Sequence, residues 1–292
     1  MSTLSHKIDF AIVFGVRNAN PNGDPLNGNR PRTDYSGLGE ITDVCIKRKI
    51  RDRLVERYTA LSGSEKKGQA VFVQSDDRKV DGWKSLKARA EDALGNKLGG
   101  TETASLACGT WIDVRAFGQL FAYASGKKNS KKANDGEGDT GVSIGIRGPV
   151  TIQSAFSKER VDITSTQITK SVSGEGDGSK RGPDTMGMKH RVDHGIYVTY
   201  GTMNPQLAER TGFSDADAET IKAILPRLFE NDASSARPEG SMEVIKVVWW
   251  KHNCKPGQYS SAKVHRSVQV NPDGSLEFSK LDGLDPEVIN GF

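Results

Sequence analysis

Large apolar side chains occupy every second position of residues 8–17, and this pattern constrains the fold more than any other feature. The positions are Ile8, Phe10, Ile12, Phe14 and Val16. Successive side chains of a strand point to opposite faces, so these five lie on the same face. The pattern predicts a strand with one buried face.

A helical pattern begins at Thr42 or Asp43, either of which can cap a helix, and runs to about Tyr58. At about 100° per residue, one side carries an apolar stripe that must face the core: Ile46, Ile50, Leu54, Tyr58 and Leu61. Lys47 and Arg51 follow one edge of this stripe, with Arg48 beside them. The other edge carries Lys49, Arg53 and Arg57.

The rest of the chain mixes strand and helix patterns. Strands are predicted at 143–156 (interrupted by Gly148-Pro149), 194–201 and 241–253, a hairpin at 267–278, and helices at about 82–94 and 214–230, with a break at Pro226. These elements do not show the regular alternation of a doubly wound fold. We therefore predict an α+β protein whose antiparallel sheet has helices on one face.

Long polar segments separate these elements. Residues 18–34 are dense in Asn, Gly and Pro and are predicted as a loop that carries Arg30 and Arg32. We interpret 1–292 as one domain with an insertion at 60–108 and a mobile surface loop at 125–141. Residues 157–193 are predicted to form a long arm that leaves the body and returns to it.

Composition narrows the cellular setting. The net charge of +4 does not by itself indicate nucleic acid, so the placement of the charges matters more. No apolar run has the length of a signal peptide or a membrane span, which predicts a cytoplasmic protein with no membrane partner. Cys45, Cys108 and Cys254 are far apart and odd in number, so we expect reduced thiols.

The chain lacks a convincing catalytic or metal motif. His190 and His194 have ligand spacing but no zincin glutamate between them. A calcium-loop pattern from Asp135 fails because its twelfth position is Ile146, where a glutamate is required. We therefore expect no metal, no cofactor and no catalytic residue.

Basic clusters carry more information. Their members stand among small or flexible residues, as phosphate ligands often do: Lys47, Arg48, Arg51, Lys180, Arg181, Lys189 and Arg191. The alternative is that the helix cations only keep a surface soluble. Met186 and Met188 on a polar arm fit solubility less well, since an exposed apolar side chain can wedge between bases or dock on a partner.

Four segments together resemble the backbone subunits of CRISPR Cascade complexes: the seventh numbered Cas family of the RAMP superfamily, in its type I-C (Dvulg) branch. They are the first strand with NPNGDP, the helix TDVCIKRKIRDRL, WIDVRAFG, and IRGPVTIQSAFS with the following arm. The resemblance runs from about residue 7 to 279, and its specificity comes from the order and spacing of the four segments.

The resemblance implies an RRM-like (ferredoxin-like) palm with a hairpin thumb that reaches over the next copy. Many copies would then form a helical filament on the CRISPR RNA, kink it, and leave segments free to pair with a target DNA strand in antiviral defence. Further expected partners are a fifth-family RNA-processing subunit, a large PAM-reading subunit and a small subunit.

By residue, the resemblance implies phosphate contacts from the helix and a thumb at 157–193 with Met186 or Met188 as wedge. Arg30, Arg32, Lys180, Arg181 and Lys189 are implied less directly. The chain contains no RNP pattern for reading bases on the sheet. Two alternatives stay open: a target-RNA endoribonuclease of the type III kind that uses Asp34, and a free-standing RNA chaperone.

Overall fold

The computed structural model describes residues 2–123, 142–169 and 186–292. Its main sheet has the strand order β14-β11-β1-β10-β8-β4-β3-β2, and β7 and β9 also pair with β10. The strands of this sheet are β1 Ile8–Ala19, β2 Gly23–Asp24, β3 Arg30–Thr33, β4 Leu38–Ile41, β7 Val150–Ile152, β8 Ala155–Arg160, β9 Ile163–Thr169, β10 Met186–Met203, β11 Met242–Lys251 and β14 Glu287–Asn290.

The predicted α+β class with an antiparallel sheet is confirmed. The helices are α1 Asp43–Ala60, α2 Leu86–Leu94, α3 Thr103–Thr110, α4 Ile112–Phe117, α5 Pro205–Thr211, α6 Asp215–Ile224 and α7 Ser261–Arg266, with short 3₁₀ turns at Pro25–Asn27, Gly63–Lys66, Gly95–Lys97 and Leu225–Arg227. Two small hairpins complete the described fold: β5 Gly118–Tyr123 with β6 Val142–Arg147, and β12 Val268–Val270 with β13 Leu276–Phe278.

β1 lies at the centre of the sheet, between β10 and β11, and pairs antiparallel with both. Its predicted apolar face is buried in the main core together with Trp249 and Tyr197. The prediction of a single buried face is wrong, however. Ala11 and Val13, on the other face, are also fully buried, in a second apolar cluster.

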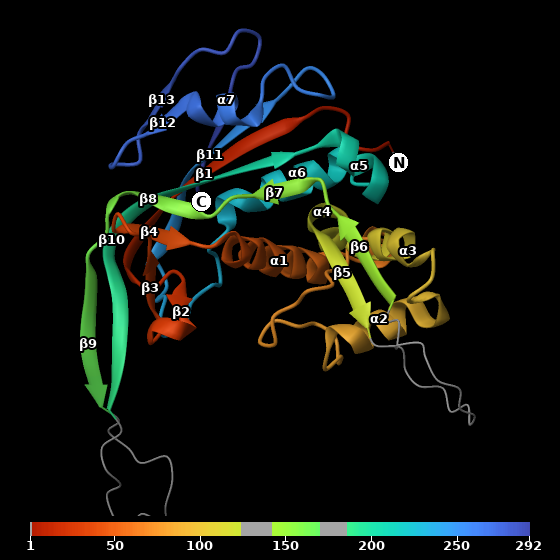
Figure 1. The fold of residues 1–292 in the computed structure, drawn as a ribbon, viewed down its shortest axis with the longest axis horizontal. Helices are drawn as coiled ribbons and strands as arrows, with labels where there is room; N and C mark the ends of the chain where they lie inside the picture. The colour runs from red at the N-terminus through yellow and green to blue at the C-terminus, as the bar shows by residue number, and fades with distance from the viewer. Residues whose placement is uncertain (1, 124–141, 170–185) are drawn as a thin grey trace, which may run out of the picture.

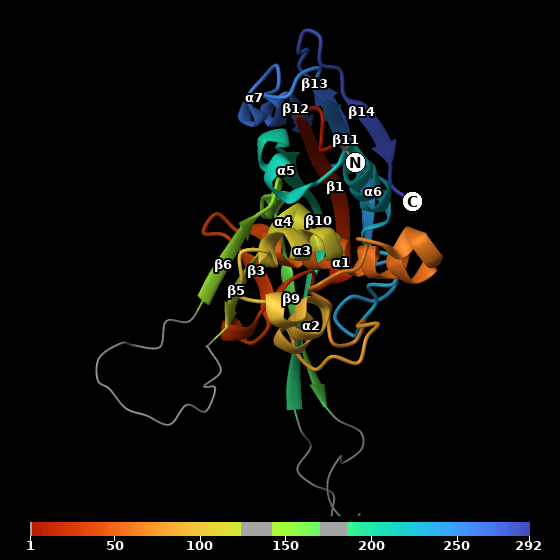
Figure 2. The ribbon, with the colours of Figure 1, turned by 90° about the vertical axis from the view of Figure 1, so that its right-hand side faces the viewer.

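Helices cover the face of the sheet that carries Phe10 and Phe14 of β1, as predicted (Figure 2). The stripe residues Ile46, Ile50 and Leu54 of α1 join the main core, and α4, α5 and α6 pack in the same layer. The predicted helix at 214–230 ends at Ile224, and Pro226 lies in the 3₁₀ turn that follows.

The second face is covered by the C-terminal part of the chain (Figure 1). Val264 of α7 and Val268 of β12 pack against Val248 and Trp250 of β11. This layer buries Ala11 and Val13 on the second face of β1.

The predicted insertion at 60–108 contributes to a third apolar cluster, separate from the sheet. Phe72 packs against Trp111 and Phe121, with ring centroids 4.6 and 5.2 Å away. Its helix α2 begins at Leu86, four residues later than predicted, because the hydroxyl of Ser85 accepts a hydrogen bond from Ala88 N and caps it. The predicted loop at 125–141 lies outside the described residues.

Candidate nucleic-acid interface

A two-stranded arm projects from the body of the molecule (Figure 1). It consists of β9 and the first part of β10, which pair from Ile163↔Val192 to Thr169↔Met186. The arm lies within the predicted thumb segment 157–193. Lys180 and Arg181 lie outside the described residues.

The strand register divides the arm into two faces. Directly paired residues share a face, and faces alternate along a strand. One face therefore carries Met186, Met188 and His190, and the opposite face carries Lys189 and Arg191. The predicted RNA-binding residues of the arm include both the methionines and the cations, and the pleat places these two kinds of side chain on opposite faces.

The methionine face is open to solvent. The side chains of Met186 and Met188 are 65% and 55% exposed, far more than apolar side chains of a core. The Met186 sulfur accepts a hydrogen bond from the Gln167 amide at 2.9 Å, which holds it against β9. Such an exposed apolar pair is suited to contact with bases or with another chain.

Polar contacts fix the root of the arm. The Thr164 hydroxyl donates to the Asp193 carboxylate at 2.7 Å, and Asp193 N donates to the Asp162 carbonyl at 3.0 Å. Arg191 forms a half-exposed ion pair with Asp193, with 3.3 Å between Nε and Oδ1. The arm is thereby continuous with the palm.

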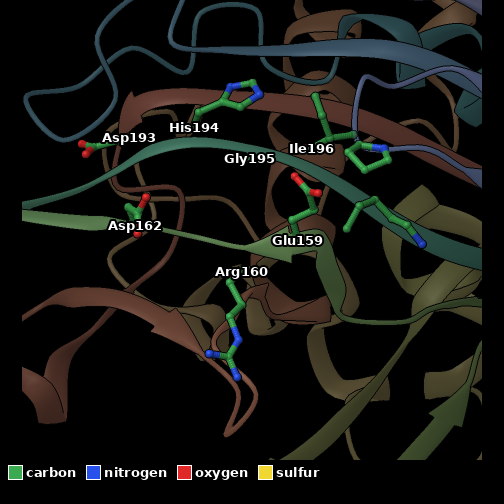
Figure 3. A pocket seen from close by; sticks show the side chains of 9 residues that line it. Glu159, Arg160, Asp162, Asp193, His194, Gly195 and Ile196 are labelled. Carbon is green, nitrogen blue, oxygen red and sulfur yellow. The ribbon is translucent and has the colours of Figure 1, made fainter.

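A cavity of about 230 Å³ lies at this root (Figure 3). Figure 3 shows Glu159 and Arg160 leaving β8 in opposite directions. The cavity is lined by Lys158, Glu159, Arg160, Asp162, Asp193, His194, Gly195, Ile196 and Pro272. Three carboxylates against two cations make this cavity a poor site for phosphate. Sequence reasoning missed Lys158 and Arg160, whose only signal was the short run SKER at 157–160.

The basic residues of α1 differ from one another in the structure. Thr42 caps the helix by accepting a hydrogen bond from Cys45 N at 3.3 Å. Arg48 is about half exposed and lies loosely near Asp52 and Asp77, at 3.7 and 3.6 Å. Lys47 is 24% exposed and pairs with Asp43 one turn earlier on the helix. Surface pairs of this kind are weak, so both cations stay available to a ligand.

Arg51 has a different setting. Its Nε donates to the buried Asp113 carboxylate at 3.0 Å, and its guanidinium lies 5.0 Å from the centre of the Phe117 ring. Asp113 also accepts backbone hydrogen bonds from Phe72 N and Val73 N. These contacts tie α1 to α4 and to the third cluster. The phosphate role of Arg51 stays a prediction, and within the described chain the charge of Arg51 is paired with Asp113.

The predicted loop at 18–34 contains short strands, so Arg30 and Arg32 lie on β3 and not on irregular chain. Arg32 forms an ion pair with Asp24 at 3.2 Å, and within the described chain its buried Nε has no partner. Arg30 is half-buried on the same strand. The Asp34 carboxylate accepts hydrogen bonds from Ser36 N and Leu38 N at 2.9 and 2.8 Å, which shape the turn before β4.

Among the described residues, no group of His, Cys, Asp or Glu side chains is arranged to hold a metal ion. No helix of the described chain is long and apolar enough to cross a membrane. The three cysteines are free, and burial raises the pKa of Cys108 to about 11, which keeps it a thiol.

A known protein family matches this chain. The family described as "CRISPR-associated protein Cas7" matches residues 6–283, nearly the whole chain. The chain belongs to the Cas7 family. A CRISPR-associated protein Cas7 from Haloferax volcanii is 26% identical to this Cas7 chain over 286 residues, which cover 94% of this chain and 78% of the relative.

Chains of solved CRISPR complexes also resemble this Cas7 chain. A chain of a CRISPR RNA-guided surveillance complex in a pre-nicking state has a TM-score of 0.45 and 16% identity, with 89% of this chain and 84% of that chain covered. A chain of a type III-B Cmr-beta complex bound to cognate target RNA has a TM-score of 0.42 and 10% identity, with 83% and 60% covered. The family predicted from the four sequence segments is confirmed by the family match.

Proposed function

We propose that this Cas7 chain is a non-catalytic backbone subunit that binds the guide RNA of a type I-C CRISPR complex. Copies of the chain would line the RNA and present its segments to a target DNA strand. The observation that carries the proposal is the two-faced arm, with exposed methionines on one side and cations on the other. A scaffold that grips a strand and displaces single bases needs both kinds of face.

Phosphate contacts are assigned to the cations that stay available. Arg48 and Lys47 on α1 and Lys189 and Arg191 on the arm are exposed or only weakly paired. Arg30 joins this set from β3, with Arg32 beside it. Arg51 is left out, because the buried Asp113 uses its charge. Binding through phosphates is independent of sequence, as a scaffold for many different guides requires.

The same proposal covers the partners and the setting. The complex would contain further copies of this chain, a fifth-family RNA-processing subunit, a large PAM-reading subunit and a small subunit, and would act in the cytoplasm. Support for this part is the family membership together with the type I-C resemblance of the four sequence segments.

The faces of the arm can be tested separately. Lys189→Ala with Arg191→Ala removes two cations, so the plot of log affinity for single-stranded RNA against log salt should become shallower by about 1.4. Met186→Ser with Met188→Ser should leave that slope unchanged and blur the periodic chemical reactivity of bases in the assembled complex. Lys280→Ala, at a side chain 83% exposed, is the matched control for charge. An unchanged slope in the cation variant would remove the arm from the interface.

The non-catalytic part has its own test. Target RNA is incubated with the assembled complex and magnesium, using the wild type and Asp34→Asn. Asparagine keeps an acceptor for Ser36 N and Leu38 N, so the turn is retained while the charge is lost. We expect intact RNA in both reactions. Cleavage at regular intervals that disappears in Asp34→Asn would replace the scaffold by the endoribonuclease alternative.

A further inference from the structure

A second cavity is lined by residues of β7 and α5 and of the segments just before β1 and α7. Figure 1 shows that α5 and the start of β1 lie at the end of the sheet away from the arm. Its volume is about 380 Å³. It is lined by Lys7, Arg147, Pro149, Thr151, Thr202, Asn204, Pro205, Gln206, Leu207, Lys255, Pro256, Ser260 and Ser261. Three of these side chains are cationic, and the lining contains no carboxylate.

The polar groups of this cavity suit an oxyanion. Thr151, Thr202 and Ser260 bring hydroxyl groups, each of which can donate a hydrogen bond, whereas the Ser261 hydroxyl is hydrogen-bonded to Asp9. Asn204 uses its amide oxygen to accept from Gln206 N at 2.8 Å, so its NH₂ group is the part that a ligand can use. No carboxylate is in the lining of this cavity, unlike that of the cavity at the root of the arm.

The three cations are held to different degrees. Lys7 is 12% exposed, donates to the Tyr259 carbonyl at 3.0 Å and lies 3.4 Å from the Asp9 carboxylate, so its position is fixed. Lys255 is about half exposed and forms an ion pair with Glu209, which is outside the lining. Arg147 is exposed, and no ion pair to it is found in the described part of the chain. One anchored and two adjustable cations match a phosphate group that arrives from solvent.

An open groove continues from this cavity. It has a volume of about 510 Å³, runs along β5 and β6, and shares Arg147 with the cavity. Phe117 and Leu120 line the groove, and the Leu120 side chain is 60% exposed. A cationic cavity that opens into a partly apolar groove fits an extended ligand with phosphates and bases better than a free ion.

We propose that this cavity binds a phosphate group of a single-stranded nucleic acid, at a site separate from the arm and α1. The choice of nucleic acid as the source of the phosphate rests on the proposed function. The site would give the subunit a second contact with nucleic acid, at the other end of its sheet.

The test uses the full-length free chain with two probes, fluorescent decathymidylate and inorganic phosphate as competitor. Arg147→Ala should make the salt dependence of decathymidylate binding shallower by about 0.7. Lys280→Ala removes the same charge elsewhere and should leave the slope unchanged. Equal slopes in the two variants would overturn the proposal.

A second variant, which should tighten binding instead of weakening it, strengthens the test. Glu209→Gln frees Lys255 from its ion pair and should tighten decathymidylate binding roughly two- to fivefold. Asp282→Asn changes the net charge equally, at an exposed carboxylate that lies outside the lining. If both variants gain the same affinity for decathymidylate, the effect comes from net charge alone and the proposed site is overturned.

Phosphate competition separates the two proposals. Inorganic phosphate should displace decathymidylate from the wild-type chain and have less effect on Arg147→Ala. This result does not depend on whether the chain assembles on guide RNA. Loss of guide binding in the arm variants leaves this result unchanged. If the arm variants bind guide RNA normally while the cavity variants behave as described, the proposed function fails and this inference stands.

Discussion

Arg48 and Arg51 lie three residues apart on α1 and have different chemistry. Arg48 extends into solvent, whereas Arg51 forms an ion pair with Asp113, whose side chain is 1% exposed. Helical periodicity places both beside the apolar stripe and cannot separate them. The distinction comes from a carboxylate 62 positions later in the chain.

Replacing the two arginines should therefore give opposite results. Arg51→Ala leaves the buried Asp113 with only its backbone donors and should lower the free energy of unfolding by about 3 kcal/mol. Arg48→Ala should leave stability unchanged and weaken RNA binding. Urea unfolding followed by circular dichroism, with RNA binding on the same samples, checks both. A fully stable Arg51→Ala with reduced RNA affinity would restore the phosphate role of Arg51.

Asp9 is a second residue whose role depends on distant partners. It is fully buried on the second face of the sheet, 2.8 Å from His252 Nε2 and 3.5 Å from His265 Nε2. His252 Nδ1 accepts a hydrogen bond from Gln258 N, so its proton is on Nε2 and is donated to Asp9. Burial alone would raise the pKa of Asp9, but polar contacts with His252, His265 and Ser261 and the charge of Lys7 outweigh it and hold the pKa below the ordinary value.

The lowered pKa makes the fold sensitive to acid. A depressed carboxyl pKa contributes stability that is complete above the ordinary value of 3.8 and is lost as pH falls below it. Asp9→Asn should be less stable than wild type at pH 7 and should show a shallower decline below pH 3.8, by up to about 1.4 kcal/mol per pH unit. Chemical unfolding at several pH values measures this, with the exposed Asp282→Asn as control. Parallel curves for wild type and Asp9→Asn would contradict the assignment.

At the scale of elements, β10 serves two parts of the molecule. Its first half forms the arm, and its second half pairs with β1 in the centre of the palm. Gly201 lies opposite Phe10 in that centre, and a Cβ atom there would come within 2.2 Å of the Phe10 ring. That ring stacks on Trp249 at 5.6 Å between centroids, so it has little room to move.

Gly201→Ala should consequently destabilise the palm by about 1–3 kcal/mol, because the core must shift to admit the methyl group. Gly187→Ala in the arm half of the same strand is the control, since its nearest neighbour would be Ile168 at an ordinary 3.5 Å. Thermal unfolding of the two variants gives the comparison. Equal melting temperatures would show that the centre of the sheet is looser than described.

The elements that sequence predicted well are those with strong local signals. β1, α1, β11 and the hairpin β12–β13 follow from periodicity and turn residues alone. The second buried face of β1 was missed because Asp9, Gly15 and Arg17 share that face with Ala11 and Val13 and make it look polar. The residues that cover this face lie some 250 positions later. The short strand β3 was missed because Asn, Gly and Pro dominate its surroundings.

The candidate site was predicted in part. The arm segment and its methionines were found, but composition cannot show which side chains share a face, and the pairing of β9 with β10 decides that. The cavity lined by Lys7, Arg147 and Lys255 was missed entirely. Its cations come from three distant segments, and each is isolated in its own stretch of sequence.

At the scale of the whole molecule, two features lie at opposite ends of the sheet. The arm extends from one end, and α5 with the cationic cavity lies at the other (Figure 1). The root of the arm is tied to the palm by Thr164, Asp162 and Asp193. If copies assemble as proposed, an arm at one end that contacts the palm of a neighbour would give head-to-tail contacts that stay open, as a filament requires.

This asymmetry leads to a prediction about assembly. Replacing residues 164–191 by Asn-Gly closes the arm at the pair Ile163↔Val192 with a two-residue turn. The palm should fold with an unchanged melting temperature, because the removed side chains that the structure describes, those of 164–169 and 186–191, are all exposed or half-buried. Alone on RNA, the variant should form no regular filament.

Mixed with wild type, the variant should still accept a neighbour's arm and end each filament, so that mean filament length falls as the fraction of variant rises. Mass photometry on guide-length RNA measures the distribution. Filaments of unchanged length at equal fractions of variant and wild type would show that the arm does not join one copy to the next.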